Sequence, residues 1–156
     1  MSLKISERQA AYIKGAIRIL EKAAMKEVIR HAPITGPSAV TDFLRLKYGQ
    51  FEREVFGVIF LNNNNQVIGI EEMFQGTTNV ASVYPREVAK RSFELNASKV
   101  IFFHNHPSGN PRPSEPDKAI TYKLQQALEL VGVEVLDHVI VTAAEEPLSM
   151  VAVGAM

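Results

Sequence analysis

From Glu54 onward, short apolar runs rich in β-forming residues alternate with helical segments, and this alternation constrains the fold more than any other feature. The apolar runs cover residues 55–61, 99–103 and 133–142, and helical segments are expected over residues 85–96 and 115–131. Short apolar runs bounded by turn signals are typical of buried strands. We therefore expect an α/β (α+β) fold in which a mixed β-sheet is flanked by helices.

Further elements complete this expected order. Four asparagines at positions 62–65 follow the first run, and asparagine tolerates the left-handed backbone of a hairpin turn. We expect the second strand to cover residues 66–70 and to extend toward Phe74, and a last strand to cover residues 148–153. Apolar residues at three- and four-residue steps predict an N-terminal helix over residues 6–30. A connector and a short helix over residues 38–48 follow it.

Composition excludes several classes of protein. Seventeen Lys and Arg balance seventeen Asp and Glu, which argues against a protein that binds nucleic acid mainly through bulk charge. The chain has no cysteine, so it has no disulfide, thiolate zinc site or cysteine nucleophile. Its longest apolar runs are too short to span a membrane, and its N-terminus lacks the layout of a signal peptide. We expect a cytoplasmic protein without membrane contact.

The segment after the run at residues 99–103 carries the most chemistry. His104 and His106 lie two positions apart as a strand is expected to end, so both imidazoles face one side of the extended backbone. A loop rich in proline and glycine follows over residues 107–113, and Asp117 lies in the first turn of the next expected helix. Such a turn can fold the carboxylate back over the histidines. Two imidazoles and one carboxylate leave the fourth zinc position open for water, as catalytic zinc sites do.

Structural roles could also explain these residues. Ser114 and Asp117 fit the S-x-x-D pattern of a capping box, and an acidic side chain near a helix N-terminus is stabilising without any metal. The histidines could be hydrogen-bonded imidazoles at a strand end. Capping and metal ligation are compatible, because a serine hydroxyl can accept the Asp117 N–H and still donate to a substrate oxyanion. Two histidines at this spacing, beside a rigid loop and an acid, favour the metal site.

A hydrolytic metal site also needs a base that accepts the proton of water. We choose Glu54 because it opens an apolar strand, where a carboxylate is poorly matched to its neighbours. A solvated charge at a strand end would explain the same residue, and Glu52, Glu71 and Glu72 compete for the role. His138, in the middle of a strand, could support the metal site from behind a ligand or be a core histidine.

The spacing of these residues resembles a known signature. Glu54 followed by the pattern H-x-H-P-x6-S-x2-D, which runs from His104 to Asp117, resembles the JAMM motif of MPN/JAB metallopeptidases. The full string HNHPSGNPRPSEPD over residues 104–117, with residues 82–87 upstream and 136–141 downstream, resembles the RadC branch of that family. The resemblance extends from about residue 33 to the C-terminus. It divides the chain into an N-terminal helix with its connector, residues 1–32, and an MPN/JAB domain, residues 33–156.

The resemblance implies a function and a role for each residue. His104, His106 and Asp117 would bind zinc, Glu54 would be the general acid/base, and Ser114 would stabilise an oxyanion. The fold would be that of MPN/JAB domains, which is similar in layout to cytidine deaminases. The reaction would be cleavage of a peptide or isopeptide amide bond in a polypeptide substrate, in a protein associated with DNA repair.

Other functions stay open at this point. A non-catalytic module that binds a partner in DNA repair or recombination could keep the same metal for structure. A metal-dependent nuclease would need a basic groove, and an Fe(II) oxygenase would use the same kinds of ligand. Full-length RadC proteins look like a DNA-binding helix-hairpin-helix region joined to this domain. Residues 1–32 allow only one helix, so we do not expect direct nucleic-acid binding. The apolar stripe of that helix could dock onto the domain or pair two copies into a homo-oligomer.

Overall fold

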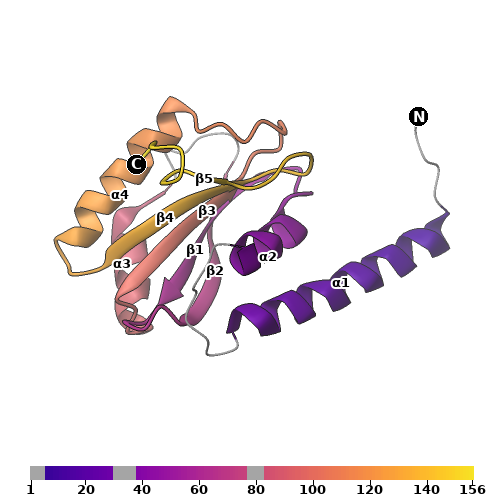
Figure 1. The fold of residues 1–156 in the computed structure, drawn as a ribbon, viewed down its shortest axis with the longest axis horizontal. Coiled ribbons are helices and arrows are strands. Elements are labelled where there is room, and N and C mark those ends of the chain that lie inside the picture. Colours follow the sequence, from indigo (N-terminus) through magenta and orange to yellow (C-terminus); the bar gives the residue numbers. More distant parts are fainter. Residues whose placement is uncertain (1–5, 30–37, 77–82) are drawn as a thin grey trace.

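The computed structural model describes residues 6–29, 38–76 and 83–156, and within them helices surround a β-sheet (Figure 1). The helices are α1 (Glu7–Ile29), α2 (Ser38–Tyr48), α3 (Pro85–Glu94) and α4 (Glu115–Glu129). The strands are β1 (Glu54–Leu61), β2 (Val67–Gly76), β3 (Lys99–Asn105), β4 (Glu134–Val141) and β5 (Leu148–Ser149). Among the described residues, no helix combines the length and apolar character that a bilayer crossing requires.

The five strands form one mixed sheet in the order β2-β1-β3-β4-β5. β3 and β4 are parallel, and the other neighbouring pairs are antiparallel. The mixed sheet flanked by helices that the sequence predicts is therefore confirmed. β3 lies in the middle of the sheet, and its residue His104 is opposite Phe56 of β1 and Ile140 of β4.

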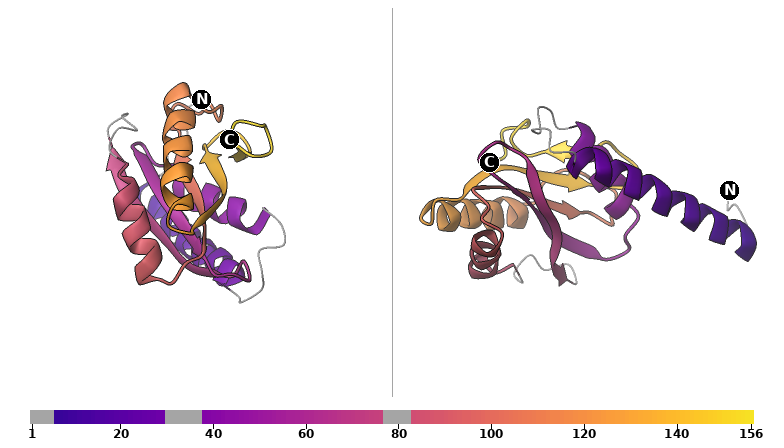
Figure 2. Two further views of the ribbon diagram at one scale, coloured as in Figure 1. Left: turned by 90° about the vertical axis from the view of Figure 1, so that its left-hand side faces the viewer. Right: turned by 90° about the horizontal axis from the view of Figure 1, so that it is seen from below.

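Side chains that alternate along the strands build a core on each face of the sheet. On β1, Val55, Ile59 and Leu61 join the core cluster that also contains Phe43 and Leu44 of α2. The intervening residues of β1 belong to a second cluster with residues of α3 and α4. The views in Figure 2 show α2 on one side of the sheet and α3 with α4 on the other. Because strands with two covered faces are apolar throughout, β1 reads as a continuous apolar run.

α1 begins with a capping box and extends away from the sheet. Ser6 and Gln9 exchange the reciprocal hydrogen bonds of that motif. Ala24 and Met25 pack against the core on the α2 side, whereas Tyr12 and Ile19 near the other end of the helix are exposed. Figures 1 and 2 show this end projecting past the domain. The predicted division of the chain after residue 32 lies outside the described residues and stays a prediction.

The last strand is shorter than the sequence predicts. Extended structure ends at Ser149 rather than continuing to residue 153, and residues 150–154 form turns. Asp137 of β4 explains this end, because its carboxylate accepts hydrogen bonds from the Ser149 hydroxyl at 2.6 Å and from the Val151 N–H at 3.2 Å. Gly154, at a φ of 68°, then adopts the left-handed backbone that glycine tolerates best.

Candidate metal centre

The end of β3 and the start of α4 bring three ligand-type side chains together. His104 lies inside the sheet and His106 just beyond β3, where its N–H still bonds to the carbonyl of Val141 at 2.9 Å. The loop then returns the chain to α4, whose first turn is fixed by Ser114 and Asp117. The Asp117 N–H donates to the Ser114 hydroxyl, and the Asp117 carboxylate accepts from the Ser114 N–H at 2.7 Å. The predicted capping box is therefore present.

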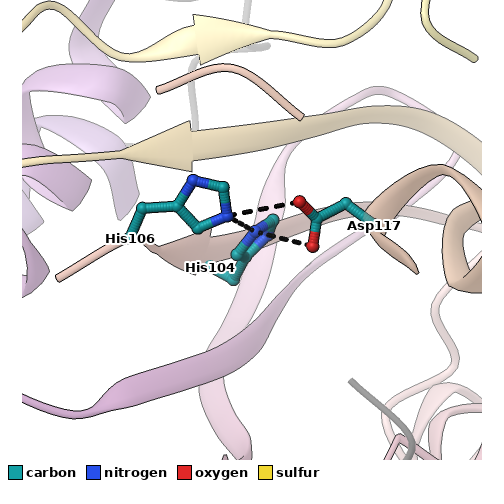
Figure 3. A group of neighbouring side chains, drawn as sticks. All are labelled: His104, His106 and Asp117. Carbon is teal, nitrogen blue, oxygen red and sulfur yellow. Dashed lines mark hydrogen bonds and ion pairs between the residues drawn. The ribbon is translucent and has the colours of Figure 1, made fainter. Parts of the chain in front are cut away.

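The same carboxylate faces both imidazoles, as Figure 3 shows. His104 Nε2 lies 3.2 Å from Asp117 Oδ1, and His106 Nε2 lies 3.3 Å from Asp117 Oδ2. The two Nε2 atoms are 2.7 Å apart. The side chains of His104 and Asp117 are 1% and 2% exposed, whereas that of His106 is 15% exposed, so solvent reaches the cluster beside His106. Asp117 therefore caps α4 and contacts both histidines at the same time.

A hydrogen bond on the far side of the His106 ring determines which of its two nitrogens carries a proton. Its Nδ1 lies 2.7 Å from the backbone carbonyl oxygen of Asn110. Because a carbonyl can only accept, Nδ1 must be the donor, and in the neutral ring Nε2 keeps its lone pair. That lone pair is directed at the same point as the Asp117 carboxylate. A backbone carbonyl that accepts from the far nitrogen in this way is a common support for a metal-binding histidine.

Neighbouring groups shift the pKa values of Asp117 and His106. Burial acts to raise the pKa of Asp117, but its interactions with the His104 and His106 rings outweigh it and hold that pKa well below its usual range. Burial acts to lower the pKa of His106, but its bonds to Asp117 and the Asn110 carbonyl leave it raised. Asp117 is therefore a carboxylate at neutral pH, and it favours the positively charged form of the His106 imidazole.

These donors fit a divalent ion. Tetrahedral zinc with bonds of about 2.0–2.1 Å places neighbouring ligand atoms about 3.3 Å apart. The two nitrogen–oxygen separations, 3.2 Å and 3.3 Å, have this length, and the two nitrogens at 2.7 Å need to move apart by about 0.6 Å. Nitrogen and carboxylate donors suit zinc among the divalent metals. The cluster of His104, His106 and Asp117 can therefore hold a metal ion.

Glu54 lines a pocket next to the cluster. A pocket of about 470 Å³ opens beside His106, and its lining includes Glu54 and Glu52. Glu54 is half-buried at the first position of β1, and Glu52 is exposed. The carboxylate of Glu54 also contributes to the raised pKa of His106, which places its charge within electrostatic reach of the ring. The role of Glu54 as the base stays a prediction.

The other carboxylates that compete for this role have different partners. Glu71 accepts hydrogen bonds from the guanidinium of Arg91 on α3, the shorter Nε contact being 2.8 Å. Glu72 accepts a hydrogen bond from the Tyr48 hydroxyl, and burial together with this carboxylate raises the pKa of Tyr48 above its ordinary value. Neither residue lines the pocket beside His106. Both carboxylates therefore serve contacts between β2 and the helices.

Ser114 directs its hydroxyl proton at Asp117, one of the three ligand-type residues. Its hydroxyl donates to Asp117 Oδ2 at 2.6 Å, while the same oxygen accepts the Asp117 N–H at 3.2 Å. To donate to an oxyanion, the hydroxyl must rotate away from this carboxylate. For Ser114 to take the predicted oxyanion role, the Asp117 carboxylate must therefore lose this hydrogen bond and gain another positively charged partner.

Two supporting residues were not identified from the sequence. Asn105, between the histidines, is buried and bonds to the segment that carries Glu54, and Thr121 of α4 lies 2.6 Å from His138 Nδ1. An asparagine inside an otherwise apolar strand is a signal that could have identified the first. His138 itself is buried with its Nε2 2.7 Å from His104 Nδ1, so it lies directly behind a ligand.

Comparisons with known proteins find a matching family model and similar relatives. A family model described as the RadC-like JAB domain matches residues 34–155. A UPF0758 protein of Vibrio cholerae is 46% identical over 143 residues, which cover 90% of this chain and 91% of that protein. A UPF0758 protein of Pseudoalteromonas translucida is 46% identical over 129 residues, covering 83% of this chain and 58% of that protein. The chain thus spans most of the first relative and less than two thirds of the second.

Proposed function

Because this chain belongs to the RadC-like JAB domain family, we propose that it is a zinc-dependent metallohydrolase that cleaves a peptide or isopeptide amide bond. The observation that carries this proposal is the convergence of two Nε2 atoms and a carboxylate at a pocket that solvent can enter. A purely structural zinc site has four protein ligands, whereas a catalytic site keeps an open position. His104, His106 and Asp117 offer three ligands, and the pocket lies beside His106.

A divalent ion bound by these residues would supply Lewis acidity, which polarises a carbonyl and makes hydroxide available near neutral pH. In this proposal Glu54 accepts a proton from the attacking water and later delivers it to the leaving amine. Ser114 donates its hydroxyl proton to the carbonyl oxygen as negative charge develops there. Water adds across the amide bond, which yields a carboxylic acid and an amine. General base catalysis by Glu54 is expected to contribute about 10²–10⁴-fold to the rate.

The proposed substrate is a polypeptide, and the proposed setting is DNA repair. The RadC resemblance supports the setting, and the chain's equal numbers of basic and acidic residues support a protein substrate rather than direct contact with nucleic acid. Nucleic acid would then be reached through a partner.

Metal analysis followed by a peptide-library screen tests the function. We expect the purified protein to bind close to one zinc per chain and the His104→Ala variant to bind far less. The zinc-loaded protein should then cleave a subset of peptides that the His104→Ala variant leaves intact. Zinc binding without cleavage of any library member would instead support a non-catalytic module with a structural metal. Preference for iron over zinc would contradict the hydrolase.

A further inference from the structure

His138 lies at the centre of β4 and has no exposed surface. The edges and faces of Phe56 and Phe102 surround its ring, with centroid separations of 5.4 Å and 5.8 Å. A polar ring in such a place must have partners for both nitrogens. Its Nδ1 lies 2.6 Å from Thr121 Oγ1, and its Nε2 lies 2.7 Å from His104 Nδ1.

The proton of the Thr121 hydroxyl has one suitable acceptor. Thr121 Oγ1 lies 2.6 Å from the backbone carbonyl oxygen of Asp117, one helical turn earlier. Two oxygens this close need a proton between them, and a carbonyl cannot supply it. Among the described residues, the other neighbour that could accept is Met150 Sδ, at 3.9 Å, and a thioether is a weak acceptor. The hydroxyl therefore donates to Asp117 and accepts from His138.

This assignment determines the tautomer of His138 first and then that of His104. Because Thr121 accepts, Nδ1 of neutral His138 carries the proton and its Nε2 carries a lone pair. That lone pair accepts from His104 Nδ1, so in the neutral ring of His104 the Nε2 atom is left unprotonated, and it faces His106 and Asp117. The opposite tautomer of His104 would place a hydrogen where a ligand needs its electron pair.

We propose that Thr121 and His138 are positioning residues that hold His104 in the tautomer required of a metal ligand. The hydrogen-bond chain begins at the backbone carbonyl of Asp117 and ends at a ring that contacts the carboxylate of the same residue. Asp117 thus supplies one ligand through its side chain and orients another through its main chain. The proposal rests on the metal-binding part of the proposed function, and it adds two residues outside the ligand set.

Substitution of Thr121 tests this chain while leaving every ligand in place. Thr121→Val removes the hydroxyl with little change of shape, and Thr121→Ser keeps it. In long-range ¹H–¹⁵N spectra of the metal-free protein at mildly alkaline pH, we expect wild type and Thr121→Ser to show His104 protonated on Nδ1. Thr121→Val should show mixed tautomers and bind zinc roughly 10- to 100-fold more weakly in a chelator competition. Thr121→Ala serves the same purpose if the valine variant does not fold.

Two results would overturn the proposal. One is wild-type His104 protonated on Nε2, and the other is a Thr121→Val protein whose His104 spectrum and zinc affinity match those of wild type. The tautomer is measured without metal, so it separates this proposal from the proposed function. If wild type shows the expected tautomer but binds no zinc, the metallohydrolase is contradicted while the orienting chain is retained.

Discussion

The buried side-chain oxygen of Asn105, the residue between His104 and His106, lies 2.7 Å from the backbone nitrogen of Val55. The amide nitrogen of the same side chain donates to the carbonyl of Arg53 at 3.0 Å. These bonds fasten the backbone on both sides of Glu54 to the strand that carries His104 and His106. The position of the proposed base is thereby coupled to the position of the proposed ligands.

Replacing Asn105 by alanine should affect Glu54 more than the ligands. The change leaves buried backbone groups without partners, at a cost of about 1–3 kcal/mol in the free energy of unfolding. We expect turnover to fall while zinc affinity stays close to wild type. Urea denaturation, zinc competition and a cleavage assay measure the three quantities. Asn64→Ala, at an exposed turn, is the matched control and should change stability by less than about 0.5 kcal/mol. A larger loss of zinc affinity than of turnover would contradict this role for Asn105.

Glu54→Gln should separate metal binding from catalysis. The amide has nearly the same shape but cannot accept a proton from water, so we expect kcat to fall by about 10²–10⁴-fold with zinc content unchanged. Glu52→Gln removes a charge from the same pocket and is the control, with turnover within a few-fold of wild type. If the two variants lose activity equally, the assignment of Glu54 is wrong.

Gly57→Ala should destabilise the sheet next to the site. Gly57 of β1 is opposite Phe103 of β3, and a Cβ atom at this glycine would overlap the Phe103 ring. The ring is fully buried and packs on Tyr48 with a centroid separation of 4.8 Å, so it has little room to move. We expect a loss of about 1–3 kcal/mol in urea denaturation. Part of it should be recovered in Gly57→Ala/Phe103→Leu.

Gly69→Ala provides the comparison for this prediction. Its nearest new neighbour is the Cδ1 atom of Leu95 at 3.2 Å, which is the end of a flexible side chain. We expect a change of less than about 1 kcal/mol there. Equal stability of the Gly57→Ala and Gly69→Ala proteins would contradict the prediction that a Cβ atom at position 57 is destabilising because it overlaps the Phe103 ring.

Zinc affinity should depend on pH through His106. Its pKa is raised above the ordinary value because hydrogen bonds to Asp117 and the Asn110 carbonyl outweigh burial. A metal ligand must be unprotonated, so protons compete with zinc below this raised pKa. We expect the apparent affinity to be nearly constant above it and to fall by up to about tenfold per pH unit below it. Chelator competition between about pH 8 and pH 6 measures this, and an affinity that does not change over that range would contradict the prediction.

The part of the site that follows from local spacing could be predicted from the sequence. The two-residue repeat of a strand places His104 and His106 on one side, and the rigid loop before α4 returns Asp117 to them. The capping pattern of Ser114 and Asp117 is equally local. The structure confirms this capping box and brings the three ligand-type side chains together.

What could not be predicted depends on which strands become neighbours. His138 is opposite Phe102 because β4 lies parallel to β3, and only this pairing places its ring behind His104. Asn105 finds its hydrogen-bond donor and its acceptors on a segment about 50 residues earlier in the chain. The early end of β5 likewise requires Asp137 from another strand. Such long-range hydrogen bonds leave no periodic pattern in the sequence.

X-ray absorption at the zinc edge of protein loaded with one equivalent of zinc shows whether His104, His106 and Asp117 bind the ion. We expect two imidazole nitrogens and oxygen ligands at about 2.0–2.1 Å, with one imidazole lost in His106→Ala. A spectrum of wild type without imidazole scattering, or one that His106→Ala leaves unchanged, would contradict the claim that these side chains bind a divalent ion.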